Sequence, residues 1–294
     1  MLGKFAEDYL NHLAYERRLA AHTLANYQRD LDVLNDLAGD RAVSALAQTD
    51  IRRFIAQLHG RGLSPKSLAR VLSGWRGFFE HLRREGLIRA NPADGVKAPK
   101  AEKRLPATLS PDEASRLVAI EDSSPAGLRD HALFELAYSC GLRVSELVSL
   151  DLTSIDLASA EVRVIGKGSK TRIVPVGKPA LAAVKAWLAA RSTRKGAESA
   201  ALFLGERGGR LSPRVVQARI KQWAIKQGIS ADVHPHMLRH SFASHVLQSS
   251  GDLRAVQEML GHASIASTQV YTHLDFQHLA KVYDAAHPRA KKKV

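Results

Sequence analysis

A basic segment with three prolines, residues 89–106, is the feature that most limits how this chain can fold. It carries one glycine and five lysine or arginine residues, and it has no sustained apolar period. This composition is typical of an extended linker. The segment therefore predicts a helical domain over 1–88 and a second domain over 107–287, each long enough to bury a core. We expect the basic tail, 288–294, to be disordered.

The first domain is predicted to be all-α, because its apolar residues recur at helical spacing in four stretches. Four starts can be read: an amphipathic helix over 3–19, a second helix capped by Thr23 and ending near Gly39, a third capped by Thr49 and ending at Gly60, and a fourth opening at Ser64-Pro65. A serine followed by proline is a typical helix start.

Positive charge is concentrated in one part of the chain. The formal net charge is +14 over 294 residues. Residues 51–104 hold thirteen basic and four acidic residues, whereas 1–50 hold five basic and eight acidic ones. A solvated helix face normally mixes both signs, so this imbalance favours a surface that binds a polyanion such as nucleic acid.

Six basic residues are the candidates for contacts to DNA phosphates. They are Lys66, Arg70, Arg76 and Arg83 in the fourth predicted helix, and Lys170 and Arg172 beside a predicted turn of the second domain. Residues three or four apart share a helix face, so the first four are expected to face one duplex. The alternative is a solvated face without a ligand.

The second domain is predicted to be mostly helical with one small antiparallel sheet. Ser110 and Glu113 have the spacing of a capping box. Two alternating β-rich runs, 161–165 and 171–176, flank the turn sequence G-K-G-S-K and indicate a hairpin. From about residue 178 the helical pattern returns, and no internal repeat is visible.

Several protein classes are disfavoured by composition. The single cysteine, Cys140, leaves no internal disulfide and no cysteine-rich zinc module. The N-terminal ten residues contain acids and lack a signal-peptide core, and no apolar run approaches the roughly 18 residues of a membrane span. We expect a cytoplasmic protein that contacts no membrane.

Six residues form an ordered constellation, although each alone would be unremarkable. They are Arg143 in G-L-R-V-S-E-L, Lys167 in G-K-G-S-K, His236 and Arg239 in H-P-H-M-L-R-H, His262 in L-G-H-A-S and Tyr271 in T-Q-V-Y-T-H. In order and local context they resemble the tyrosine recombinase (phage integrase) family. The resemblance covers nearly the whole chain, and the run from Tyr271 to about residue 290 is similar to one branch of that family.

The resemblance implies a site-specific DNA recombinase that cuts and rejoins DNA through a 3′-phosphotyrosyl intermediate. Its fold would be a four-helix SAM-like core-binding domain followed by a mostly helical catalytic domain. Tyr271 would be the nucleophile, with Arg143, Arg239 and His262 binding the non-bridging oxygens. His236 would be the general base and Lys167 the general acid. No cofactor or metal is implied.

The resemblance also implies partners. These are a duplex recombination site of the dif type, a XerD-like recombinase in a heterotetramer that resolves chromosome dimers, and an FtsK-like DNA translocase as regulator. The helix over about 276–286 is a candidate for docking into a neighbouring subunit, the alternative being packing within its own domain.

Other interpretations stay open at this point. The basic helical stretch alone fits a DNA-binding module without chemistry, and another integrase would share the six residues. His236 and His240, four residues apart, have a zinc-ligand spacing, but no glutamate follows His236 as in H-E-x-x-H. Tyr283 is the nearest rival nucleophile. Glu146 and Asp130 are expected either to support the catalytic arginines or to be surface or capping carboxylates.

Overall fold

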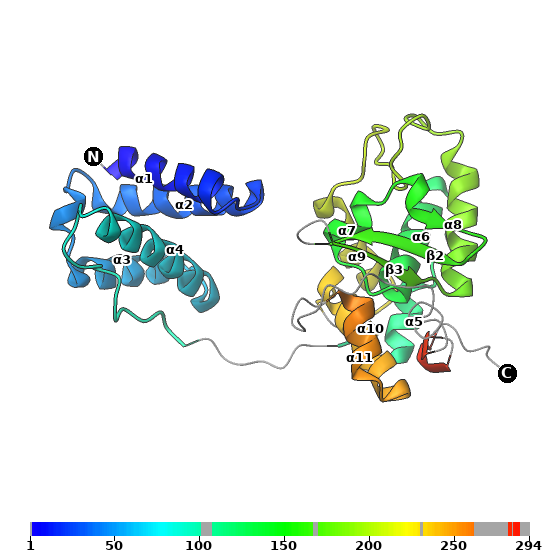
Figure 1. Ribbon diagram of the computed structural model, residues 1–294. Coiled ribbons are helices and arrows are strands. Elements are labelled where there is room, and N and C mark those ends of the chain that lie inside the picture. Colours follow the sequence, from blue (N-terminus) through cyan, green and yellow to red (C-terminus); the bar gives the residue numbers. More distant parts are fainter. Residues whose placement is uncertain are drawn as a thin grey trace. The chain divides into compact units, whose positions relative to one another are not determined.

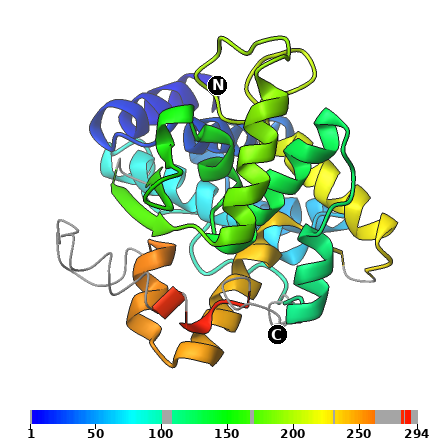
Figure 2. The same cartoon turned by 90° about the vertical axis from the view of Figure 1, so that its right-hand side faces the viewer.

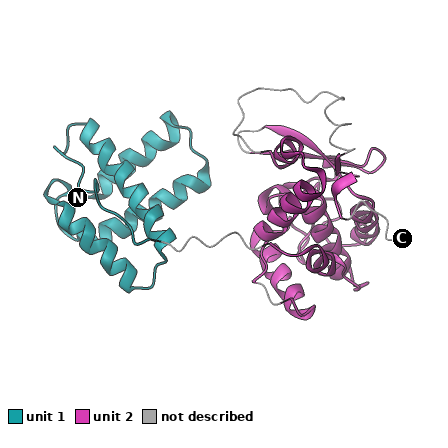
Figure 3. Cartoon of the chain, turned by 90° about the horizontal axis from the view of Figure 1, so that it is seen from below, with its two compact units in different colours: residues 1–104 teal, residues 105–294 magenta. Residues whose placement is uncertain are grey.

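The computed structural model describes residues 2–100, 108–166, 170–229, 232–261, 282–283 and 285–288. The chain divides into two compact units, Met1–Arg104 and Leu105–Val294 (Figure 3). Across these segments, no helix combines the length and apolar character needed to cross a membrane.

The first unit is helical throughout its described elements (Figure 1). They are α1 (Leu2–Asn11), the π-helical turn η1 (His12–Glu16), α2 (Ala21–Ala38), the 3₁₀ turn η2 (Val43–Ala45), α3 (Gln48–Gly60) and α4 (Pro65–Arg84). The helix predicted over 3–19 is therefore α1 continued by η1. Together these elements confirm the predicted four-helix fold.

One face of α4 supplies much of this unit's core. Trp75, Phe78 and Phe79 are fully buried. They recur at positions i, i+3 and i+4, which lie on one side of a helix. The Trp75 ring meets Phe54 of α3 edge-on, and its indole nitrogen donates to the Asp30 carbonyl of α2 at 2.7 Å. The polar atom of the largest core side chain is thereby satisfied.

Local signals located one helix start correctly and two incorrectly. Ser64 accepts a hydrogen bond from the Ser67 amide at the start of α4, as predicted. Thr23 and Thr49 are not caps, because α2 follows Ala20 and α3 follows Ala47. At α3 the Asp50 carboxylate accepts from the Ala47 amide at 3.0 Å, which is the second half of a capping box.

Part of the predicted linker packs onto the first unit. Ala93 and Val96 are buried. The Arg76 guanidinium donates to the Val96 carbonyl at 2.7 Å and to the Ala93 carbonyl at 3.3 Å. The Asn91 side-chain amide donates in turn to the Arg76 carbonyl at 3.1 Å. Residues 91–96 are therefore held by α4 and do not form an extended connection.

The second unit combines seven helices with one small sheet among the described residues. The elements are α5 (Pro111–Val118), α6 (Pro125–Ser139), α7 (Val144–Ser149), η3 (Leu152–Ser154), β1 (Ile155–Asp156), β2 (Glu161–Ile165), β3 (Thr171–Pro175), α8 (Lys178–Arg191), α9 (Pro213–Lys226), α10 (Pro235–Ser250) and α11 (Leu253–Leu260). The predicted Ser110–Glu113 capping box is present, with both hydrogen bonds formed.

The sheet is antiparallel in the order β1-β2-β3, as expected of a hairpin. Val164 of β2 pairs with Arg172 of β3, and Val162 pairs with Val174. The three valines and Arg172 are all buried. Arg172 thus occupies a core-facing position of the strand, where an apolar residue is usual.

Helix α6 lies at the centre of the second unit's core and packs against α8 and α10. Figure 2 shows α8 crossing the face turned to the viewer. Most of α6 is buried, including Tyr138, whose hydroxyl is 2.8 Å from His245 Nδ1 of α10. His245 Nε2 lies 3.0 Å from the Leu109 carbonyl. These contacts fix α10, which carries two of the predicted catalytic residues.

Candidate active site

Arg143 stands at the residue before α7. Its backbone amide donates to Glu146 Oε2 at 2.8 Å, and its Nη1 donates to Glu146 Oε1 at 2.7 Å. The side chain remains 35% exposed. The turn that delivers it requires Gly141, which has a φ of +59° and would place a Cβ 2.4 Å from a Phe242 ring carbon. The sequence G-L-R-V-S-E-L therefore encodes both the turn and the acid that orients the arginine.

Arg239 reaches the same carboxylate from α10. Its Nη1 donates to the Gly141 carbonyl at 2.7 Å and its Nη2 to the Leu260 carbonyl at 2.6 Å. Its Nη1 lies 3.8 Å from Glu146 Oε2. Burial, and then the charge of Arg143, lower the pKa of Arg239 to about 10, which leaves it protonated at neutral pH. Two predicted catalytic arginines, 96 positions apart, thus meet at one acid.

A third arginine completes the cluster. Arg172 of β3 donates from Nη1 to Glu146 Oε1 at 3.0 Å and from Nη2 to Glu146 Oε2 at 2.9 Å. Burial alone would raise the pKa of Glu146, but the hydrogen bonds from Arg172 and Arg143 outweigh it and lower that pKa to about 2. One carboxylate is therefore surrounded by three guanidinium groups, and the excess positive charge favours binding of an anion.

His236 lies one turn before Arg239 on α10 and is exposed. Partial desolvation of the ring, followed by the positive charges of His234, His240 and the two arginines, lowers the pKa of His236 below the usual histidine value. A neutral imidazole at neutral pH can accept a proton, as a general base must. His234 has a role that the sequence did not reveal: its Nδ1 accepts from the Met237 amide at 3.1 Å and caps α10.

Three predicted catalytic residues, Lys167, His262 and Tyr271, lie outside the described residues. Gly166, which precedes Lys167, and Gly261, which precedes His262, are described, and both lie beside Arg172. A Cβ on Gly261 would stand 3.1 Å from Arg172 Cδ, and one on Gly166 would stand 3.7 Å from Arg172 Nη1.

Tyr283, the rival candidate for the nucleophile, is buried in the second unit. Tyr283 is 1% exposed, its hydroxyl lies 2.5 Å from Ser139 Oγ, and its ring stacks on His287 at 4.7 Å between centroids. A hydroxyl enclosed in this way has no access to a DNA phosphate. Tyr283, Ala286 and His287 are buried in their own unit, so the described part of the segment over 276–286 does not present these side chains to a neighbouring subunit.

The two predicted supporting acids differ in position. Glu146 contacts the two arginines that are predicted to be catalytic, Arg143 and Arg239. Asp130 of α6 instead pairs with Arg129 at 2.8 Å and Arg219 at 2.5 Å, and it accepts from the indole nitrogen of Trp223 at 3.0 Å. Asp130 therefore connects α6 to α9 within the core.

The six candidate DNA contacts fall into different environments. Lys66 and Lys170 are exposed. Arg70 is half-exposed and ion-paired with Asp30, while Arg83 makes a two-point contact with Glu80 at 2.8 and 2.9 Å.

The other two candidates are engaged inside the protein. Arg76 holds residues 91–96 through their backbone carbonyls. Arg172 is only 5% exposed and bonds to Glu146 and Met259. The expected phosphate contacts at these two positions therefore differ from the contacts that the structure shows.

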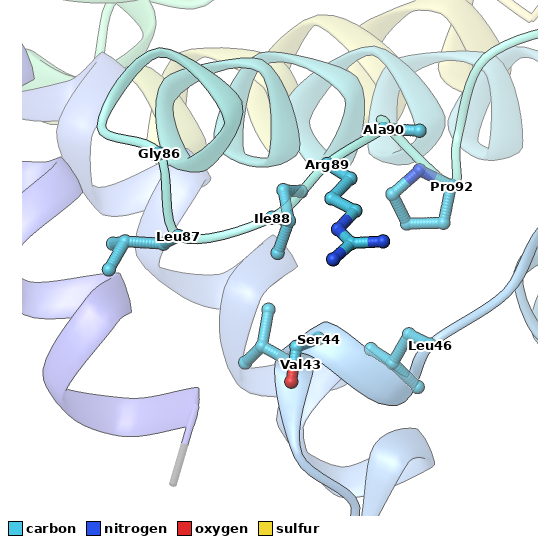
Figure 4. Close-up of a pocket in the computed structure, with 9 residues that line it drawn as sticks. All are labelled: Val43, Ser44, Leu46, Gly86, Leu87, Ile88, Arg89, Ala90 and Pro92. Carbon is cyan, nitrogen blue, oxygen red and sulfur yellow. The ribbon is translucent and has the colours of Figure 1, made fainter.

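A cavity of about 470 Å³ lies in the first unit, between η2 and the segment after α4. It is lined mainly by apolar side chains such as Val43, Leu46 and Ile88, with Arg89 extending into the space (Figure 4). None of the predicted site residues lines it. In the described segments, no three histidine, cysteine, aspartate or glutamate side chains are grouped so that they could hold a metal ion.

Comparison with known proteins places this geometry in a family. Residues 107–278 match the phage integrase family, and residues 6–86 match the phage integrase N-terminal SAM-like domain. Tyrosine recombinase XerC of Alcanivorax borkumensis is 54% identical over 97% of this chain and 94% of its own length. Tyrosine recombinase XerC of Shewanella amazonensis is 53% identical over 99% of this chain and 98% of its own length.

Solved structures agree with this fold. The XerA recombinase aligns over 96% of this chain and 98% of its own length, with 28% identity and a TM-score of 0.51. A lambda integrase dimer bound to a COC′ core site aligns over 92% of this chain and 99% of its own, with 20% identity and a TM-score of 0.72. The chain therefore belongs to the phage integrase family of tyrosine recombinases, the enzymes that cleave and rejoin DNA at specific sites.

Proposed function

We propose that this chain cleaves one DNA strand by attack of the Tyr271 hydroxyl on a backbone phosphorus. The bond formed is a 3′-phosphotyrosyl ester, and the bond broken is the one to the 5′-oxygen of the next nucleotide. His236 takes the phenolic proton and Lys167 supplies a proton to the departing oxygen. The reverse attack by a 5′-hydroxyl from another strand restores a phosphodiester bond, so no external energy source is required.

The arginine cluster is the observation that carries this proposal. Arg143 and Arg239 converge on Glu146, and the three arginines together exceed its single negative charge by two. A pentavalent phosphorane transition state develops charge on its non-bridging oxygens, and fixed guanidinium donors stabilise that charge. His262 is assigned as a further donor to the same oxygens, on the family pattern.

The cellular role is proposed from the relatives. Their shared designation, XerC, at 53–54% identity over nearly the whole chain supports a XerC-type enzyme acting on a dif-type duplex site. In this proposal two copies work with two copies of a XerD-like recombinase in a tetramer that resolves chromosome dimers in the cytoplasm, and an FtsK-like translocase regulates them. The terminal run from Tyr271 onward supports the same branch.

A nicked suicide duplex tests the chemistry. The duplex loses a short fragment on cleavage, so the covalent protein–DNA adduct accumulates and survives SDS. We expect the wild-type chain to form the adduct in the presence of EDTA. Tyr271→Phe should form none, while Tyr283→Phe should form the adduct and show reduced stability, because it removes the hydroxyl beside Ser139.

Three outcomes of this assay would count against the proposal. Failure of the wild-type protein to form an adduct on a dif-type duplex would favour a DNA-binding module without chemistry. An adduct with Tyr271→Phe would place the nucleophile elsewhere. Loss of the adduct on addition of EDTA would indicate a metal-dependent reaction.

A further inference from the structure

Arg172 is the most enclosed member of the arginine cluster. Its side chain is 5% exposed, and all three of its guanidinium nitrogens have partners inside the protein. Nη1 and Nη2 form a two-point contact with the two oxygens of Glu146, and Nε donates to the Met259 carbonyl at 2.9 Å. Three of the five guanidinium N–H groups are used inside the protein, and burial of the side chain keeps the other two from a DNA phosphate.

Arg172 and its two partners, Glu146 and Met259, belong to three different elements, each of which lies close in sequence to a predicted catalytic residue. Arg172 belongs to β3, at one side of the hairpin; Glu146 belongs to α7, which begins after Arg143; and Met259 belongs to the last turn of α11. The contact of Arg172 with Gly261 is so close that a side chain there would need the arginine to shift. The guanidinium thus connects strand, helix start and helix end at one point.

The hydrogen bonds of Glu146 show what Arg172 does for its neighbours. An ionised carboxylate has about four acceptor sites. Arg143 fills two of them, through its backbone amide and Nη1, and Arg172 fills the other two. The plane of the carboxylate is therefore fixed by Arg172 in the orientation that holds Arg143.

The same occupancy affects Arg239. Its Nη1 stays 3.8 Å from Glu146 Oε2, beyond hydrogen-bond distance, and its guanidinium is held by the Gly141 and Leu260 carbonyls instead. Without Arg172, the carboxylate would have two unfilled acceptor sites facing two other arginines. Glu146 would then be drawn from its 3.8 Å ion pair with Arg239 into a direct hydrogen bond, and both catalytic guanidinium groups would shift.

We propose that Arg172 is a positioning residue for DNA cleavage, which acts through Glu146 to keep Arg143 and Arg239 in their places without touching the scissile phosphate. This inference rests on the proposed function, because it assumes that the two arginines bind the reacting phosphate. It replaces the direct phosphate contact predicted for Arg172 from the sequence. Arginine is needed because lysine carries its donors on a single nitrogen, which cannot contact both Glu146 oxygens and the Met259 carbonyl in this planar arrangement.

Single-turnover cleavage of the suicide duplex by Arg172→Lys and Arg172→Gln tests the proposal. We expect adduct formation to slow by roughly 10–100-fold, since small displacements of positioning groups have effects of that size. The dissociation constant for intact duplex and its salt dependence should stay as in the wild type. A direct phosphate contact would instead weaken binding and reduce the log–log salt slope by about 0.9.

The pH profile separates positioning from simple loss of stability. In the wild type, Glu146 stays ionised far below neutral pH because Arg172 and Arg143 lower its pKa to about 2. The wild-type rate falls at acid pH as the proposed base His236 is protonated. Removing Arg172 raises the pKa of Glu146, so cleavage by Arg172→Gln should fall more steeply than in the wild type over the same acid range. Adding Glu146→Gln to Arg172→Gln removes the ionising group, and the extra acid-side loss should vanish.

Arg191 provides the matched control. It is also buried in the second unit, and its guanidinium holds the Ala197, Ser199 and Ala201 carbonyls without contacting Glu146. Arg191→Lys should lower the thermal midpoint and leave the pH profile of cleavage unchanged.

The failures of the two proposals are distinguishable. A wild-type chain that forms no adduct contradicts the proposed function. Wild-type cleavage with unchanged rate and pH profile in both Arg172 variants contradicts the positioning role alone. If neither variant folds, as judged by circular dichroism, Arg172 is a structural residue and the proposal is wrong.

Discussion

Glu146 is a buried acid whose charge is more than balanced by its neighbours. The three arginines stabilise the buried carboxylate only while it is ionised, because each guanidinium group is attracted to its negative charge. The same acid holds the backbone amide of Arg143 and so caps α7. A single side chain therefore determines both a helix start and the orientation of Arg143, a proposed catalytic group.

Replacement of this acid should destabilise the second unit in a pH-dependent way. The pKa of Glu146 is lowered from 4.5 to about 2. Its contribution of about 3 kcal/mol is therefore present above pH 4.5 and is lost as the pH falls toward 2. Urea unfolding at about pH 7 should show Glu146→Gln less stable by roughly 3–5 kcal/mol. The difference in unfolding free energy between the wild type and Glu146→Gln should narrow toward about pH 3. A difference that is constant with pH would contradict the lowered pKa of Glu146.

Gly141 should be the glycine of the second unit least tolerant of substitution near the site. Its φ of +59° is unfavourable for alanine, and the added Cβ would meet Phe242 at 2.4 Å. Its carbonyl also accepts from Arg239. Gly141→Ala should therefore lower the thermal midpoint and slow adduct formation. Gly251→Ala is the control: it has a φ of +66° but open space around it, so it should cost about 1 kcal/mol and leave cleavage unchanged. Equal effects of the two substitutions would contradict the steric argument.

Helix α4 serves two purposes on its two sides. One side is buried in the first unit's core, and the other bears the basic residues that the sequence assigned to DNA. These residues differ in how accessible they are to a ligand. Lys66 is exposed to solvent, whereas Arg76 donates hydrogen bonds to the carbonyls of Ala93 and Val96. Charge alone therefore does not identify a phosphate contact on this helix.

The salt dependence of DNA binding should distinguish these two residues. Each phosphate contact contributes about 0.9 to the slope of log affinity against log salt concentration. Lys66→Gln should lower the slope by about that amount. Arg76→Gln should leave the slope unchanged and lower the stability of the first unit, because it releases residues 91–96. Fluorescence anisotropy with a labelled duplex over a salt series measures both slopes, and a drop with Arg76→Gln would assign that residue to DNA after all.

Whether an interaction at this scale could be predicted from the sequence depends on how far apart its partners lie along the chain. The Ser64 cap and the Ser110–Glu113 box depend on residues three apart, so they were predictable. Arg172 could not be assigned to Glu146, because the partners are 26 residues apart and meet only after the hairpin docks on α7. The ordered motifs were enough to predict the family, whereas the positions of Lys167, His262 and Tyr271 in the site stay predictions.

At the scale of the whole molecule, the buried apolar side chains of the described segments form two hydrophobic cores. One comprises apolar residues of α1 to α4 together with Ala93 and Val96, and the other begins at Leu109 and extends to Ala286. Because no buried residue that the structure describes belongs to both clusters, each unit should open independently of the other in the free protein. Duplex DNA, which both parts are proposed to bind, is then the ligand through which their stabilities become linked.

Hydrogen exchange measured by mass spectrometry tests this independence. Leu72→Ala in α4 and Leu136→Ala in α6 remove matched, fully buried side chains and should each cost about 2–5 kcal/mol. In free protein, Leu72→Ala should reduce protection in Pro65–Arg84 and leave Pro125–Ser139 unchanged, and Leu136→Ala should do the reverse.

With a saturating duplex, protection should rise in both segments, because DNA binds only the folded units. Since loss of one unit also weakens the hold of DNA on the other, Leu72→Ala should then reduce the DNA-dependent gain in Pro125–Ser139. A Leu72→Ala effect on that segment without DNA would mean that the cores are coupled in the free chain.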